Sequence, residues 1–330
     1  MKKNRNSCLK KSLFQRKTIQ LILLGFIFVS LGFTSVTEGR EGKYPSKAIK
    51  IVAPFRVGGG SDVEVRAIAP FLQQYLGVPV GIENVVGARG VVCYNKFYRE
   101  TPDGYTLIFL NLPSPIVPEL TTKTEYRTAE YTFIRAVSIK RLILATKYGK
   151  FKDFSDFIKQ AKIKKPRFAI TGPSSDLQGY VLQDRLGMEF IWVPMEAAAR
   201  GLSAVLGGHV DGVFTFLLSG LPLIEAKKIS ALMLFADKRD PRVPDIPTPK
   251  DLGYDFSLVR VVSGFLGPPG MAADKVKVIA EAVARLPKDP KYMAWAEKRG
   301  VVVEHLPSSQ FKQVAEEHYK IINKYKNVFR

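Results

Sequence analysis

The sequence predicts a protein of the α/β class, in which short strands alternate with helices. From Tyr44 onward, apolar runs alternate with segments whose apolar residues recur at helical spacing, the pattern of parallel α/β folding. Two strand-to-helix junctions also combine glycine with serine, a composition that lets a ligand approach the backbone. The composition agrees, because 46% of the 330 residues are hydrophobic and 24% are charged, which is ordinary for a globular protein.

The expected strands are short apolar runs bounded by polar or turn-forming residues. They are Ile49–Ala53, Val80–Glu83, Thr106–Leu110, Leu142–Thr146, Phe168–Ile170, Phe190–Val193, Gly212–Phe214 and Ala231–Leu234. The expected helices have apolar residues on one face, at a spacing of three or four. They are Asp62–Leu76, Asp176–Leu186, Ala197–Leu206, Ala272–Arg285, Pro290–Lys298 and Ser309–Tyr325. The proline-rich stretch Pro244–Pro249 is expected to be a stiff connection.

The N-terminal residues differ from the rest of the chain. Seven Lys or Arg residues precede an apolar run from Ile19 to about Val36, and small residues follow near Ser35–Gly39. This order is typical of a secretory signal peptide, which we expect over residues 1–39. The apolar run is nearly long enough to span a bilayer, so an uncleaved membrane anchor is the alternative. In both cases we expect export, with the rest of the chain in the periplasm.

Charge and reactive residues argue against several classes of protein. The formal net charge is +20, to which residues 1–39 contribute +6 (seven basic residues less one acid). The other basic residues are scattered among acids, which favours a solvated surface over a nucleic-acid interface. The histidines are widely separated, so we expect no metal site. Cys93 is alone outside the leader, which predicts a buried thiol and no disulfide.

The first glycine-containing junction, Gly58–Gly60, follows the strand expected at Ile49–Ala53. A dinucleotide fingerprint would need a third glycine where Val63 stands, and a phosphate loop would need lysine where Ser61 stands. Asp62 adds a negative charge that disfavours a phosphate. The N–H groups that open the following helix can still attract a smaller anion.

The second junction, Thr171–Ser174, follows the strand expected at Phe168–Ile170. Both junctions continue with a serine that is followed three residues later by Glu or Gln, namely Ser61 with Glu64 and Ser175 with Gln178. These pairs predict capping boxes, which alone would explain the serines. Both junctions also lie at the carboxyl ends of strands, where open α/β sheets bind ligands, so together they predict a cleft.

Several segments occur in an order that resembles one protein family. They are YPSKAIKIVAPFRVGGGSDVEVRAIAPFLQQYLGVPVGIEN, TPDGYTLIF, GGHVDGVF, DIPTPKDLGY and GFLGPPGM. Together they resemble the extracytoplasmic solute receptors of tripartite tricarboxylate transporters, the Bug-type receptors. The resemblance covers nearly everything after Tyr44, and the combination is specific although each segment alone is weak.

The resemblance implies a type II periplasmic binding protein fold, in which two α/β domains hold a ligand cleft between them. Domain 1 would contain residues 44–143 and 259–330, and domain 2 would contain residues 144–258. The resemblance also implies that two loops contact a small carboxylate through backbone N–H groups, hydroxyls and bound water. The implied residues are Phe55, Gly58, Gly59, Gly60, Ser61 and Asp62 in the first loop, and Thr171, Gly172, Ser174, Ser175 and Asp176 in the second.

Further site candidates depart from the family pattern. Met195 and Thr215 stand where the family commonly has tyrosine and an acid, and Arg56 stands where proline is frequent. Arg56 is either an ordinary surface residue or a bidentate donor for a second carboxylate at the mouth of the cleft. In the second role it would offset the acids introduced at Asp176 and Glu196.

We therefore expect a monomeric receptor, without cofactor or catalysis, that captures a small organic carboxylate by domain closure. Its partner would be a membrane permease of the tripartite tricarboxylate type, and no nucleic acid is expected. One alternative is a carboxylate-sensing receptor for a signalling partner. The other is an enzyme on the same scaffold, which is disfavoured because the loops contain no histidine and the sequence has no G-x-S-x-G elbow.

Overall fold

The computed structural model describes residues 44–195, 197–255 and 258–329. The signal peptide or anchor expected at residues 1–39 lies outside the described residues, as does Glu196. Within the described part of the chain, no helix has both the length and the apolar character needed to cross a membrane.

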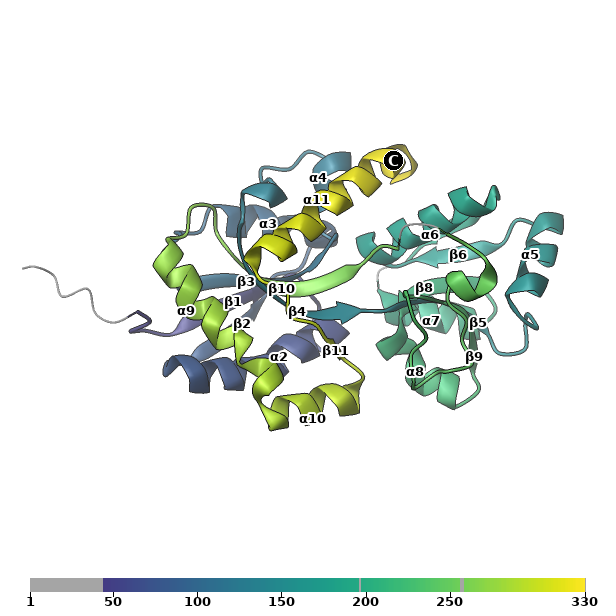
Figure 1. Ribbon diagram of the computed structural model, residues 1–330. Coiled ribbons are helices and arrows are strands. Elements are labelled where there is room, and N and C mark those ends of the chain that lie inside the picture. The colour runs from purple at the N-terminus through teal and green to yellow at the C-terminus, as the bar shows by residue number, and fades with distance from the viewer. Residues whose placement is uncertain (1–43, 196, 256–257, 330) are drawn as a thin grey trace, which may run out of the picture. The chain divides into compact units, whose positions relative to one another are not determined.

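The first lobe is built on a six-stranded sheet, whose strands lie in the order β11-β4-β10-β3-β1-β2 (Figure 1). Strand β1 runs parallel to both β2 and β3, whereas β10 runs antiparallel to β3 and β4. The strands span Ile49–Ala53 (β1), Val80–Asn84 (β2), Thr106–Leu112 (β3), Thr132–Lys140 (β4), Val261–Gly267 (β10) and Val302–Val303 (β11).

The second lobe is built on a five-stranded sheet in the order β7-β6-β8-β5-β9 (Figure 1). Strand β6 is parallel to β7 and β8, and β5 is antiparallel to β8 and β9. The strands span Leu142–Lys147 (β5), Arg167–Ile170 (β6), Ile191–Pro194 (β7), Gly212–Phe216 (β8) and Ile229–Phe235 (β9).

The chain crosses between the sheets twice. Arg141 alone separates β4 from β5, and the chain returns through the segment that enters β10 at Val261. Because β5 and β10 enter their sheets from the other lobe, both run antiparallel to their neighbours, so each sheet combines parallel and antiparallel strands. The expected domain boundaries lie close to these crossings, and their exact positions stay a prediction.

Ten α-helices surround the two sheets in the described part of the chain. The first lobe contains α2 (Gly60–Leu76), α3 (Val91–Tyr98), α4 (Ile116–Thr121), α9 (Ala273–Ala284), α10 (Pro290–Arg299) and α11 (Ser308–Tyr325). The second contains α5 (Phe154–Ile163), α6 (Pro173–Leu186), α7 (Ala198–Leu206) and α8 (Leu217–Glu225). Each helix predicted from the sequence is present, although α2 and α6 begin earlier than expected.

Each lobe is stabilised by a core of buried apolar side chains. Ile51, Phe109 and Phe265 are fully buried in the first sheet, and Phe168 and Phe214 in the second. Burial of such side chains is the main favourable contribution to folding. In the first lobe, Cys93 on α3 is 1% exposed, and burial raises the pKa of its thiol to about 12. The prediction of a buried thiol is confirmed.

Candidate ligand-binding cleft

The first glycine loop is closed by Asp62 in the first turn of α2. The Asp62 carboxylate accepts the Gly58 N–H at 2.8 Å and the Asn84 amide at 2.7 Å. The Arg66 Nε, one turn further along the helix, lies 3.0 Å from both carboxylate oxygens. Burial favours the neutral acid, but the bonds from Arg66, Gly58 and Asn84 outweigh it and lower the pKa of Asp62. Among the described residues, the partners of this carboxylate therefore all belong to the first lobe.

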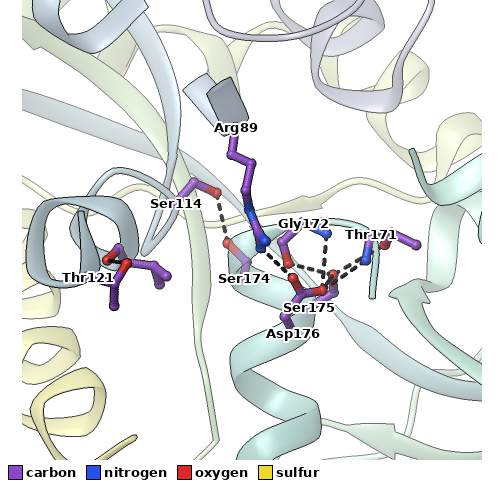
Figure 2. Close-up of polar contacts among 9 residues, drawn as sticks. Arg89, Ser114, Thr121, Thr171, Gly172, Ser174, Ser175 and Asp176 are labelled. Carbon is purple, nitrogen blue, oxygen red and sulfur yellow. Dashed lines mark hydrogen bonds and ion pairs between the residues drawn. The ribbon is translucent and has the colours of Figure 1, made fainter. Parts of the chain in front are cut away.

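The second loop is closed in the same way by Asp176 in the first turn of α6 (Figure 2). One carboxylate oxygen accepts the N–H groups of Thr171 at 2.9 Å and Gly172 at 3.1 Å. The other accepts Arg89 Nη2 at 2.5 Å, from the turn between β2 and α3. Burial raises the pKa of Asp176, and Arg89 with the two N–H groups opposes that rise. Here one partner comes from the opposite lobe.

The predicted capping boxes are wrong. Helices α2 and α6 have Gly59 and Gly172 at their N-caps, and neither cap has a side-chain bond. The two serines therefore lie inside the first helical turn. Glu64 instead binds Ser138 Oγ and lies 2.5 Å from Lys140 Nζ, both on β4. The Oε1 of Gln178 accepts the N–H of Val259 at 2.9 Å. Glu64 and Gln178 therefore bind distant segments of the chain and do not cap their own helices.

A second contact crosses between the lobes beside the Arg89–Asp176 pair. The hydroxyls of Ser114, which follows β3, and Ser174, which opens α6, lie 2.9 Å apart. Figure 2 shows both contacts meeting the first turn of α6 from the side of the first lobe. The N-terminus of α6 is therefore joined to the first lobe at two points.

A cavity of about 680 Å³ lies at these loops and is lined from both lobes. All the site candidates predicted from the sequence line it, except Gly58 and Asp62, which bind each other. The lining candidates are Phe55, Arg56, Gly59, Gly60, Ser61, Thr171, Gly172, Ser174, Ser175, Asp176, Met195 and Thr215. Their contact with a ligand stays a prediction.

Several backbone N–H groups of the two glycine loops are already bonded within the protein and cannot donate to a ligand. The N–H groups of Gly58, Thr171 and Gly172 already donate to the two aspartates, and Gly59 N–H donates to the Arg56 carbonyl. The remaining donors at this end are the first-turn N–H groups of α2 and α6, which have no acceptor inside their own helices. Two helix N-termini thus border one cavity, and their partial positive charges favour an anion.

The sequence prediction missed a third loop that lines the cavity, the turn Val86–Gly90 after β2. Ala88 and Arg89 have φ values of 44° and 57°, a left-handed conformation that side chains rarely adopt. The two glycines that flank them, Gly87 and Gly90, were the available signal, because glycines at a strand-to-helix junction had already indicated the other two loops.

A series of buried side-chain hydrogen bonds lies at the cavity lining. Asn111 on β3 donates to Ser61 Oγ at 2.9 Å and accepts Ser263 Oγ at 2.8 Å, and Ser61 and Asn111 both line the cavity. Thr215 on β8 also lines it, and its hydroxyl is buried without a hydrogen-bond partner among the described residues. A buried hydroxyl normally has a partner, so Thr215 identifies a position where a ligand or water would complete the bonding.

Comparison with known proteins agrees with this geometry. Residues 65–328 match the profile described as the tripartite tricarboxylate transporter family receptor. The chain belongs to this family. Its fold is that of a periplasmic binding protein with two α/β domains, and receptors of this family bind substrates and are not enzymes.

Individual relatives of this tripartite tricarboxylate receptor chain have low sequence identity to it but match most of its length. It is 26% identical to protein BugT of Bordetella pertussis over 258 residues, which is 76% of this chain and 78% of BugT. MatC from Rhodopseudomonas palustris, solved with bound malate, is 25% identical with a TM-score of 0.75. That match covers 87% of this chain and 100% of MatC. A structure described as a periplasmic transporter is 26% identical with a TM-score of 0.75, covering 84% and 95% of the two chains.

Proposed function

We propose that this chain captures a small organic carboxylate in the cavity between its lobes and delivers it to a membrane permease of the tripartite tricarboxylate type. The observation that carries the proposal is the pair of helix N-termini, on α2 and α6, that border one cavity from opposite lobes. Each offers N–H donors to a carboxylate, and charge-assisted bonds of this kind contribute about 1.5–3 kcal/mol each. The malate bound to MatC supports the same class of ligand.

Capture would occur by closure of the lobes and without catalysis. Among the described residues that line the cavity there is no histidine, cysteine or lysine that could act as a base or nucleophile. A panel of carboxylates tests the proposal: at least one should raise the melting temperature while the carboxylate itself stays chemically unchanged. Turnover of the carboxylate would contradict a receptor role, and a panel without any thermal shift would contradict carboxylate binding.

We also propose that the protein acts in the periplasm as a monomer. The basic and apolar leader of the sequence supports export, and the related structure described as a periplasmic transporter supports the same compartment. N-terminal sequencing of the periplasmic fraction should find a chain that begins between about Ser35 and Lys43. An intact Met1 on a membrane-bound species would instead indicate a retained anchor.

A further inference from the structure

Arg89 occupies a position where a side chain is disfavoured. It lies in a run of four positive φ angles, 137° at Gly87, 44° at Ala88, 57° at Arg89 and 100° at Gly90. Glycine adopts such angles readily and arginine does not, so an arginine here has a conformational cost. Its guanidinium reaches Asp176 of the opposite lobe (Figure 2). The Arg89 side chain lines the cavity and is 52% exposed.

Both oxygens of the Asp176 carboxylate already accept hydrogen bonds within the protein. Its side chain is 1% exposed, and Thr171 N–H, Gly172 N–H and Arg89 all donate to it. These donors stabilise the charged form of the carboxylate and oppose the rise in its pKa that burial causes. A ligand carboxylate therefore cannot use these two N–H groups, which bind the protein's own carboxylate in its place.

The formal charges of the residues around the cavity favour a ligand with a single negative charge. Among the described lining residues, the charged ones are Arg56, Arg89 and Asp176, which sum to +1. Glu196 lies outside the described residues, and its charge can only lower this sum. A monoanion would neutralise the formal charge of the described set, whereas a dianion would leave a net charge of −1, because Asp176 offsets one of the two arginines.

The rest of the wall is largely apolar. Phe55, Val86, Ile170, Pro194, Met195 and Phe216 contribute to it from both lobes. Such a surface gains free energy by covering hydrocarbon and loses it by desolvating a charged group. The favoured occupant has a charged group at one end and an apolar body.

We propose that the Arg89–Asp176 pair makes this receptor selective for monocarboxylates with an apolar body, aliphatic or aromatic, over dicarboxylates of the same length. The proposal rests on the proposed function, because it specifies the class of carboxylate that the same cavity takes. Arg89 supplies a guanidinium to the ligand, and Asp176 cancels the additional positive charge that a second carboxylate would need.

Matched ligands that differ by one carboxylate provide the test. Calorimetric titration of the purified protein compares hexanoate with adipate and benzoate with terephthalate. Wild type should bind each monocarboxylate at least tenfold more tightly than its dicarboxylate. Asp176→Asn removes the charge with little change of shape, so it should reduce that preference at least tenfold.

Asp184→Asn is the control variant. Asp184 lies on the same helix and also pairs across the lobes, with Lys324 at 2.9 Å, but it does not line the cavity. Its variant should keep the wild-type preference. Equal or tighter binding of the dicarboxylates by wild type overturns the proposal, even if Asp176→Asn does not fold. An unchanged preference in folded Asp176→Asn also overturns it, and binding of no carboxylate at all overturns the proposed function with it.

Discussion

The two glycine loops close in the same way but depend on different parts of the molecule. Asp62 and Asp176 are each 1% exposed in the first turn of a helix, and each accepts N–H groups of the loop before it. Arg66 and Asn84, which complete the bonding of Asp62, belong to its own lobe. Arg89, which completes the bonding of Asp176, belongs to the other lobe.

The conformation of the first loop depends on its own lobe, whereas that of the second loop depends on contact between the lobes. The first loop can keep its conformation whatever the position of the second lobe, because its bonds are internal. The second loop has its full set of bonds only while the lobes are together. Closure of the lobes should therefore alter the electrostatics of the second loop and leave the first unchanged.

The largest expected difference between the loops concerns their glycines. A Cβ at Gly59 would lie 3.1 Å from the Arg56 carbonyl, whereas a Cβ at Gly172 meets no atom within 4 Å. Gly59→Val should weaken ligand binding by about 2–3 kcal/mol, because it crowds both the loop backbone and the cavity. Gly172→Val should weaken it less, and calorimetry of both variants measures the difference. Equal effects would mean that the loops approach the ligand equally closely.

Arg56 extends the comparison, since the first loop carries an arginine and the second does not. Arg56→Ala should weaken binding of an anion by about 1.5–3 kcal/mol. Arg56→Lys should recover part of that loss, because an ammonium keeps the charge but not the bidentate fork. Titration at two salt concentrations checks this. Unchanged affinity of Arg56→Ala at low salt, where charge effects are largest, would make Arg56 an ordinary surface residue.

The two aspartates should give stability profiles of opposite sign with pH. The folded chain lowers the pKa of Asp62, so its stabilisation is present at neutral pH and is lost as the pH falls below about 4. The folded chain raises the pKa of Asp176, so its ionisation reduces stability as the pH rises from about 4 toward that raised pKa.

Urea unfolding between pH 3 and 7 measures both profiles. Asp62→Asn should flatten the loss of stability in acid and cost about 1.5–3 kcal/mol at neutral pH, the contribution of charge-assisted bonds. Asp176→Asn should remove the loss that accompanies a rise in pH. If both variants change the profile in the same direction, the two carboxylates are in equivalent environments and the comparison fails.

The smallest expected effect belongs to Ser174. Its hydroxyl pairs with Ser114 across the lobes at 2.9 Å and lines the cavity. Ser174→Ala should reduce affinity by about 0.5–1.5 kcal/mol, because one neutral hydrogen bond is lost. Ser114→Ala removes the same cross-lobe bond from the other side. Loss of affinity in Ser174→Ala alone would indicate direct ligand contact, and no loss in either variant would place the ligand elsewhere.

The sequence predicted the sheet interiors better than the crossings between them. Strand β1 has the predicted bounds, because its residues are apolar except for Lys50, and Pro54 follows it directly. Strands β4 and β10 were missed although both are largely buried. Gly264 and Ser263 interrupt the apolar pattern of β10 because it lies very close to β4, where a Cβ at Gly264 would be 2.6 Å from the Arg135 carbonyl.

In the site, too, the sequence predicted local features better than contacts between distant segments. Glycine and serine at two junctions were sufficient to identify two walls of the cavity, because local composition determines local loop geometry. Arg89 and Ser114 were missed, since their role depends on which segments face each other across the lobes. The serines were predicted to cap helices, but the aspartates beside them close the loops because a carboxylate accepts more hydrogen bonds than a hydroxyl.

The buried thiol of Cys93 makes the first lobe accessible to kinetic measurement. A thiol with a pKa of about 12 contains almost no thiolate at neutral pH, and at 1% exposure an alkylating reagent cannot reach it. Alkylation therefore has to wait for a local opening event, and its rate reports how often that event occurs. Because α3 begins directly after the turn that carries Arg89, slower alkylation at saturating ligand would record the solute restraining that turn.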